Sequence, residues 1–156
     1  MSSITELKDA VNTKTINLVL LSIATGGIYP ILWIYRNTPV ISSITKRVVS
    51  DDVFIIWLAV CVGLGAALVG TGEEVMDIIS GLLSFAGLVL YVVWAFKART
   101  SIQEYALNEH RVDLRMNAFY TFFFNIYYIN YCINDLPEAK RRQEVLSGGQ
   151  TTPAQS

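Results

Sequence analysis

The side chains that could do chemistry in this sequence are mostly neutral amides and hydroxyls within long apolar stretches. The candidates for a buried polar cluster are Thr25, Asp77, Asn125, Asn130 and Asn134. Asn130 and Asn134 are four residues apart and therefore share one face of a helix. Polar groups in apolar surroundings need hydrogen-bond partners. The pattern favours amides that bind neighbouring helices, and the alternative is a polar cavity that admits a solute.

Asp77 is the one carboxylate inside a long apolar stretch. Carboxylates at membrane depth are often functional, because an uncompensated charge is costly there. Asp77 follows Glu74 by three residues, however, so it falls in the first turn of its helix. An acid at that position is stabilised by the helix dipole. We interpret Asp77 as an interfacial acid, with an ion or proton site as the alternative.

Cysteine and histidine are too sparse to indicate a metal centre or a nucleophilic enzyme. Cys61 and Cys132 lie in apolar stretches without C-x-x-C spacing, which is typical of buried thiols, and His110 is the sole histidine. No phosphate loop, dinucleotide fingerprint or zinc motif is present in the sequence. We therefore predict no catalytic residue, no metal and no cofactor, and a protein that is not an enzyme.

The elements that must position these side chains are long and apolar. The chain has 156 residues, of which 53% are hydrophobic and 16% charged, whereas soluble domains are about 25% charged. Twelve Lys and Arg nearly balance 13 Asp and Glu, which disfavours a nucleic-acid partner. The apolar residues form four blocks: Thr15–Tyr35, Val53–Thr71, Val75–Phe96 and Ala118–Asn134. This pattern predicts an all-α integral membrane protein whose principal partner is the lipid bilayer.

Two of the four blocks contain residues that interrupt a helix. Gly26 and Gly27 lie in the middle of the first block, with Pro30 shortly after them. About ten apolar residues on each side would reach about 15 Å, or half the bilayer. Asn125 divides the fourth block in the same way, and Asn accepts a left-handed backbone conformation more readily than most residues. We predict that both blocks are broken and re-entrant, and the alternative is a kinked helix that crosses fully.

The distribution of Lys and Arg separates these models. If only the second and third blocks span, all 12 cations lie on one side, whereas four spans would divide them five to seven. Cytoplasmic segments are enriched in Lys and Arg, so the two-span model is favoured. A mixed model, in which the fourth block also spans, divides them nine to three and stays open. We expect a multi-pass inner-membrane protein with both termini cytoplasmic and residues 72–74 on the opposite side.

One segment is similar to a known family. Residues 25–35, TGGIYPILWIY, resemble the T-x-G-I-Y-P-x-x-W-x-Y signature of a small prokaryotic integral-membrane family that is defined only as a domain of unknown function. Residues 127–136 resemble the closing part of the same domain. The resemblance implies a bacterial inner-membrane protein. It implies no activity, substrate or catalytic residue.

Small residues in the two central blocks predict close helix contact. They lie near one face of each block, and they are Gly63, Ala67, Gly70, Ser80, Ser84 and Gly87. Small side chains let helix backbones approach closely in lipid. We predict a tight antiparallel hairpin, and the alternative is a homo-oligomer that uses the same face.

The segments outside the central hairpin are predicted to be short helices. Thr38 and Pro39 have the types that begin a helix, and a short amphipathic helix with a basic face would follow them. The third block keeps its apolar stripe to about Leu107, which predicts one long helix. Pro137 could begin a last short helix, and residues 150–156 are expected to be disordered. This gives a cytoplasmic tail at 1–14, one membrane domain at 15–136, and a helix with a tail at 137–156.

The function that this organisation suggests is not catalytic. Two half-depth elements and an amphipathic helix on one leaflet would shape the membrane or dock a partner, as a homo-oligomer. The alternative is a small channel or transporter in which the polar cluster lines a cavity on the cytoplasmic side.

Overall fold

The computed structural model describes residues 3–148 of the chain, and within this range it contains helices and no strand. The helices are α1 (Glu6–Val11), α2 (Thr15–Ala24), α3 (Ile28–Thr45), α4 (Asp52–Leu68), α5 (Glu74–His110) and α6 (Ala118–Gly148). The all-α prediction is confirmed. The predicted disordered tail, residues 150–156, lies outside the described residues.

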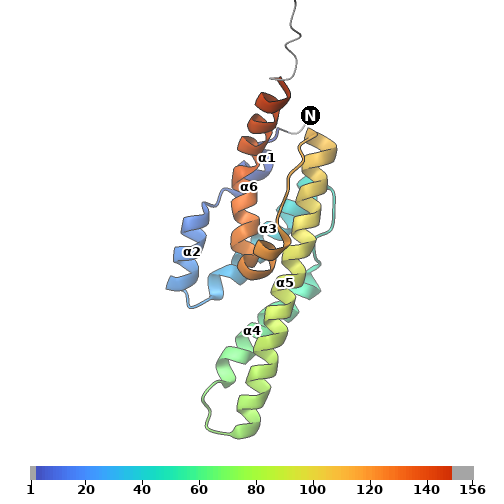
Figure 1. The fold of residues 1–156 in the computed structure, drawn as a ribbon. Coiled ribbons are helices and arrows are strands. Elements are labelled where there is room, and N and C mark those ends of the chain that lie inside the picture. The colour runs from blue at the N-terminus through green and yellow to red at the C-terminus, as the bar shows by residue number, and fades with distance from the viewer. Residues whose placement is uncertain (1–2, 149–156) are drawn as a thin grey trace, which may run out of the picture.

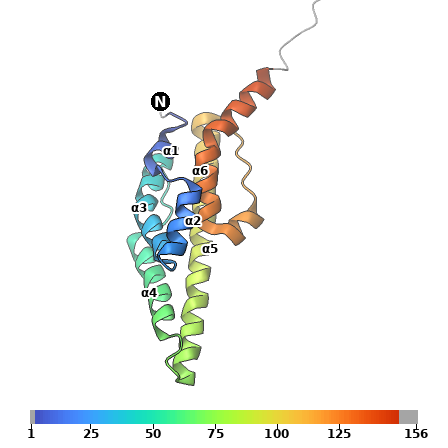
Figure 2. The same ribbon diagram turned by 90° about the vertical axis from the view of Figure 1, so that its left-hand side faces the viewer.

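The long helix α5 organises the molecule. It has 37 residues, which corresponds to about 55 Å. At one end it forms a two-helix hairpin with α4, and at the other end α1, α2, α3 and α6 gather around it (Figures 1 and 2). The sequence predicted one helix from about Val75 to about Leu107, and this prediction is confirmed. Asp51 begins α4 as a cap, since its side chain accepts a hydrogen bond from the Phe54 amide at 3.1 Å.

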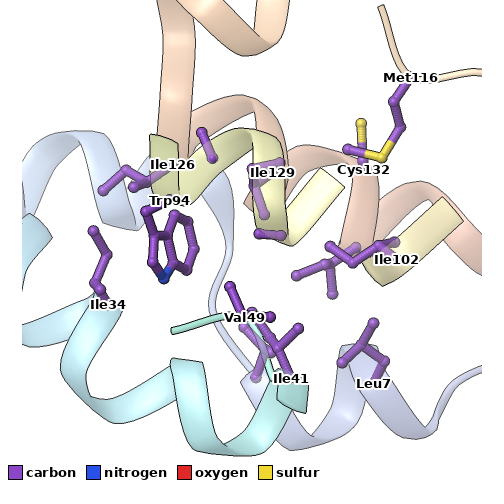
Figure 3. Close-up of a cluster of buried hydrophobic side chains, with 14 of the residues drawn as sticks. Leu7, Ile34, Ile41, Val49, Trp94, Ile102, Met116, Ile126, Ile129 and Cys132 are labelled. Atoms are coloured by element: carbon purple, nitrogen blue, oxygen red, sulfur yellow. The ribbon is translucent and has the colours of Figure 1, made fainter. Parts of the chain in front are cut away.

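The apolar core lies in the broad end, between α3, α5 and α6. Trp94 of α5 is fully buried beside Ile34 of α3 and Ile126 of α6 (Figure 3). Further along the same core, Leu7 of α1 lies near Ile41 of α3. Residues 6–11, which fall in the predicted tail, are therefore a helix that contributes to the core.

The hairpin contact does not use the face that the sequence indicated. A Cβ atom at Gly65 would lie 2.8 Å from the Ser84 hydroxyl oxygen, whereas one at Gly63 would meet nothing within 4 Å. Ala67 is also exposed, and Gly70 lies beyond α4 with a φ of 75°. The prediction that Gly63, Ala67 and Gly70 form the hairpin contact is wrong.

The residues of α5 that the sequence selected do lie at this contact. The Ser80 hydroxyl donates to the Gly65 carbonyl at 2.7 Å. A Cβ atom at Gly87 would lie 3.0 Å from the Val62 side chain. Ser80, Ser84 and Gly87 are thus confirmed as packing residues, with the Gly65 face of α4 as their partner.

Both predicted helix breaks are confirmed. Gly26 and Gly27 have φ values of 60° and 91° and separate α2 from α3, and glycine adopts such values without a steric penalty. Pro30 is buried in the first turn of α3, where its missing amide is tolerated. Asn125 interrupts α6 with a φ of 42° and a ψ of −117°, so the arm 118–124 leaves the line of the second arm (Figure 2).

Two predicted helix starts are wrong. Thr38 and Pro39 lie inside α3, and Pro137 lies inside α6. A proline inside a helix costs about 3 kcal/mol. Burial of Thr38 and Ile41 on α3, and of Ile133 and Leu136 on α6, offsets that cost. The helices therefore continue through both prolines because their apolar faces stay in the core.

Candidate functional site

The five polar residues selected from the sequence do not form one cluster. Asp77 is exposed at the α4–α5 turn, whereas Asn125, Asn130 and Asn134 belong to α6 in the broad end of the molecule. The Asp77 carboxylate accepts a hydrogen bond from the Gly70 amide at 3.2 Å. Asp77 therefore lies in the first turn of α5, as predicted, and holds the α4–α5 turn through Gly70. Its location at a membrane interface stays a prediction.

Asn130 and Asn134 together hold the connector between α1 and α2. Each side-chain amide donates to the Thr13 carbonyl at 2.9 Å, and that of Asn130 also lies 3.1 Å from the Thr15 hydroxyl. Asn134 donates to the Asn130 carbonyl within α6 as well. These amides replace the backbone partners that a connector lacks, so they fix the point from which α2 leaves α1.

Thr25 and Asn125 lie at the two helix breaks. The Thr25 hydroxyl donates to the Leu21 carbonyl at 2.7 Å and accepts from the Tyr29 amide at 2.9 Å, so it links α2 to α3. The buried side-chain oxygens of Asn125 and Asn130 have no hydrogen-bond partner among the described residues. The side chains of Thr25, Asn130 and Asn134 thus hold neighbouring segments together.

Trp94 is a structural residue of the core, and its side chain is fully buried. Its indole donates to the Thr38 hydroxyl at 2.9 Å, and its ring meets that of Trp33 edge to face at 6.0 Å. The sequence predicted Thr38 as a helix cap. In the structure its hydroxyl instead accepts the hydrogen bond from Trp94 of α5.

A large part of the molecular surface is apolar. The exposed large apolar side chains fall mainly on α2, the start of α3, α4, the first part of α5 and the first arm of α6, and they include Ile23, Leu32, Trp57, Leu82, Phe85, Phe119 and Phe123. Within residues 3–148, α5 is the one helix long and apolar enough to cross a membrane. Only 22% of its most apolar window is buried, whereas the core helix of a soluble protein is mostly covered. The 17-residue α4 is a shorter apolar helix beside it.

The basic surface lies beyond the apolar part of α5. Lys46 pairs with Glu109 at 2.8 Å, and Arg47 pairs with Glu104. The hydrogen bond and the charge of Glu109 raise the pKa of Lys46, and the same contact lowers the pKa of Glu109. A recess of about 590 Å³ opens here between the α3–α4 connector and α5, and it is lined by Lys46, Arg47, Val48, Phe96, Lys97, Thr100 and Ser101. No local sequence pattern indicates this recess, because Lys46 on one wall and Phe96 on the other are 50 residues apart along the chain.

The two cysteines are free and buried, as predicted. In the part of the chain that the structure describes, no three His, Cys, Asp or Glu residues lie close enough to hold a metal ion.

Comparison of the chain with protein-family models, curated proteins and solved structures finds no match. The resemblance of residues 25–35 to the membrane family therefore stays a prediction. Over residues 3–148, the structure defines an all-α fold with one helix that could span a membrane and many exposed apolar side chains.

Proposed function

We propose that this chain is a non-enzymatic integral membrane protein that shapes one leaflet or docks a partner there. The observation that carries the proposal is the division of the surface along α5. Apolar side chains are exposed along the α4–α5 hairpin, on α2 and on the first arm of α6, while Lys and Arg begin at Lys97 on α5. Lipid would cover the apolar part, and the cations would remain on the cytoplasmic side.

The two broken elements support a re-entrant arrangement. α1 contacts both α3 and α6, so the two ends of the α2–α3 hairpin lie at the same end of the molecule (Figure 1). Residues 111–117 run back along α5, where Gln103 donates to the Leu114 carbonyl and Arg99 to the Met116 carbonyl, both at 3.0 Å. We therefore expect the segment from Ala118 onward to start and end on one side of the membrane as well.

The length of α2 sets the depth of the proposed wedge. Ten residues correspond to about 15 Å, or half the hydrocarbon core. Side chains such as Ile23 and Ile28 are exposed near its tip, where lipid tails would surround them. A protein that inserts such elements into one leaflet adds volume to that leaflet alone. We expect this asymmetry to be its contribution to membrane shape or to partner docking.

Assembly into a homo-oligomer is part of the proposal. Gly63 and Ala67 lie on the face of α4 away from α5, and this face is exposed. Small residues on a lipid-facing helix suit close contact with a second helix. Chemical crosslinking of the unmodified chain and, separately, of Gly63→Leu tests this part. We expect a crosslinked oligomer with the unmodified chain and its loss with the variant.

The channel or transporter alternative rests on the unpartnered oxygens of Asn125 and Asn130. It predicts proton or potassium leak through liposomes that contain the purified chain, and loss of that leak in Asn130→Ala with assembly intact. The structural proposal predicts no leak above that of empty liposomes. A leak abolished by Asn130→Ala would overturn it.

The topology is tested by labelling single cysteines in intact cells with a maleimide that cannot cross the bilayer. The positions are Asp9, Ser43, Glu73, Arg115 and Arg141, each in a chain whose native cysteines are replaced by Ala. We expect labelling from outside at position 73 alone, and labelling of the others only after permeabilisation. Labelling at 9 and 141 together with 73 would indicate four spans. Labelling at 141 and 73 but not at 9 would indicate the mixed model, in which the fourth block also crosses.

A further inference from the structure

The basic recess beside α5 has the features of a binding site for an anion. Its two walls bring three cations together, Lys46 and Arg47 from the α3–α4 connector and Lys97 from α5. Thr100 and Ser101 also line it, and the Thr100 hydroxyl donates to the Phe96 carbonyl at 3.1 Å. Cations that converge from two segments are groups that form charge-assisted hydrogen bonds with phosphate oxygens.

The cations of the recess are available to a ligand. The ion pairs of Lys46 with Glu109 and of Arg47 with Glu104 are at the surface, with the two basic side chains 75% and 55% exposed. Such pairs contribute little free energy in water, so both cations can turn toward an anion. Lys97 has no carboxylate within 4 Å in residues 3–148, and its ammonium lies over the Phe54 ring at 5.6 Å from the centroid. Three cations against two carboxylates leave the recess positive.

The recess also has an apolar border on the side of α4. Val48 is 82% exposed at its edge, and Phe96 forms part of its wall. α4 begins at Asp52, and its exposed Val53, Ile56 and Trp57 follow directly. The recess therefore places positive charge next to the start of an exposed apolar helix. A phospholipid has the corresponding arrangement, with its phosphate at the edge of the acyl chains.

We infer that this recess binds the phosphate group of an anionic phospholipid, with Lys97 and Arg47 as its principal contacts and the Val48 edge against the acyl chains. The inference rests on the proposed membrane insertion and names the lipid class that the proposed protein recognises. Free phosphate is also an anion, but it has no apolar part that could contact the border at Val48. A lipid is therefore favoured.

The test is binding of short-chain phosphatidylglycerol to the full-length chain purified in a neutral detergent. The same titration uses short-chain phosphatidylcholine, glycerol phosphate and inorganic phosphate as comparison ligands. The variant is Arg47→Gln with Lys97→Gln. The matched control is Arg115→Gln with Arg142→Gln, which removes the same charge at exposed sites outside the recess.

We expect phosphatidylglycerol to bind more tightly than the other three ligands. Each cation removed from the recess should weaken binding about fivefold, and the double variant about 25-fold. The control variant should bind within about twofold of the unmodified chain, because Arg115 and Arg142 do not line the recess. Lys97→Arg, which keeps the charge, should retain most of the affinity.

Three results would overturn the inference. An equal loss of affinity in the control variant would indicate diffuse electrostatic attraction. Equally tight binding of inorganic phosphate would indicate a site for the free anion. Equally tight binding of phosphatidylcholine would show that the recess is not a site for anionic lipid. If the double variant fails to fold by circular dichroism, Lys97→Gln alone decides, with a fivefold loss expected. The labelling experiment at position 73 tests membrane insertion separately, so failure of the lipid site and failure of the proposed function are distinguishable.

Discussion

Substitution of Gly65 by alanine should open the α4–α5 hairpin, whereas the same change at Gly63 should not. A methyl group at Gly65 would lie 2.8 Å from the Ser84 hydroxyl oxygen and 3.2 Å from the Ser84 backbone nitrogen. The hydroxyl can rotate away, but the backbone can move only if α5 moves. At Gly63 the methyl group would meet nothing within 4 Å. The two positions lie on the same helix, two residues apart, and therefore form a matched pair.

The expected size of the effect follows from two opposing terms. Replacing glycine by alanine inside a helix stabilises it by about 1 kcal/mol at either position. Overpacking of a tight contact costs about 1–3 kcal/mol, and this cost applies to Gly65 alone. Gly65→Ala should therefore be less stable than Gly63→Ala by about 1–3 kcal/mol. Ser84→Ala removes the nearest atom, so its combination with Gly65→Ala should recover part of the loss.

The assay is reversible unfolding of the purified chain in mixed micelles by titration with a denaturing detergent, followed by circular dichroism. A difference of about 1.4 kcal/mol changes the ratio of folded to unfolded chain tenfold. Equal stability of the two variants, or a lower stability of Gly63→Ala, would refute the assignment of the hairpin face. The sequence pattern that selected Gly63 would then be the better guide.

Three further changes probe the breaks, the core and the C-terminal end of α5. Asn125→Gly should stabilise the chain by about 1 kcal/mol in the same titration, because glycine adopts the φ of 42° without strain, and a loss of stability would contradict this. A double-mutant cycle of Trp94→Phe and Thr38→Val should give a coupling of about 1 kcal/mol for the 2.9 Å hydrogen bond, and additive effects would show that the bond contributes nothing. Burial, and then the charge of Lys140, lowers the pKa of His110 below its ordinary value of 6.5, so the folded chain binds that proton less readily than the unfolded chain. The stability due to neutral His110 should be complete above the ordinary pKa and fall as the pH drops toward the folded-state pKa, and a stability–pH profile should be flatter in His110→Gln.

Some features of the structure were accessible from the sequence because they depend on a few neighbouring residues. Gly26, Gly27 and Asn125 break their helices through their own backbone preferences, and each break was predicted at the residue where it occurs. The cap of α4 is equally local, since Asp51 accepts a hydrogen bond from the amide of Phe54, three residues away. The apolar run that continues beyond Phe96 likewise predicted one long helix.

Other features were inaccessible because they depend on which segments meet. α4 is apolar on all sides, so its pattern could not say whether Gly63 or Gly65 faces α5. The pairing of Asn130 with the Thr13 carbonyl joins positions more than 100 residues apart, and no local pattern marks it. The prediction of one polar cluster was wrong for the same reason. Asp77 and the amides of α6 are all polar residues within apolar stretches, but they lie in different parts of the fold.

The amino-acid sequence alone determined that this chain is helical, that its helices break at Gly26–Gly27 and at Asn125, and which stretches are long and apolar, since backbone preference and hydrophobicity are properties of single residues and short runs. The tertiary structure decided that Pro39 and Pro137 lie within helices, that Gly65 is the close contact, and that Lys97 shares a recess with the distant pair Lys46 and Arg47. Each of these depends on burial against a partner helix, and a free energy of burial exists only once the partner is in place.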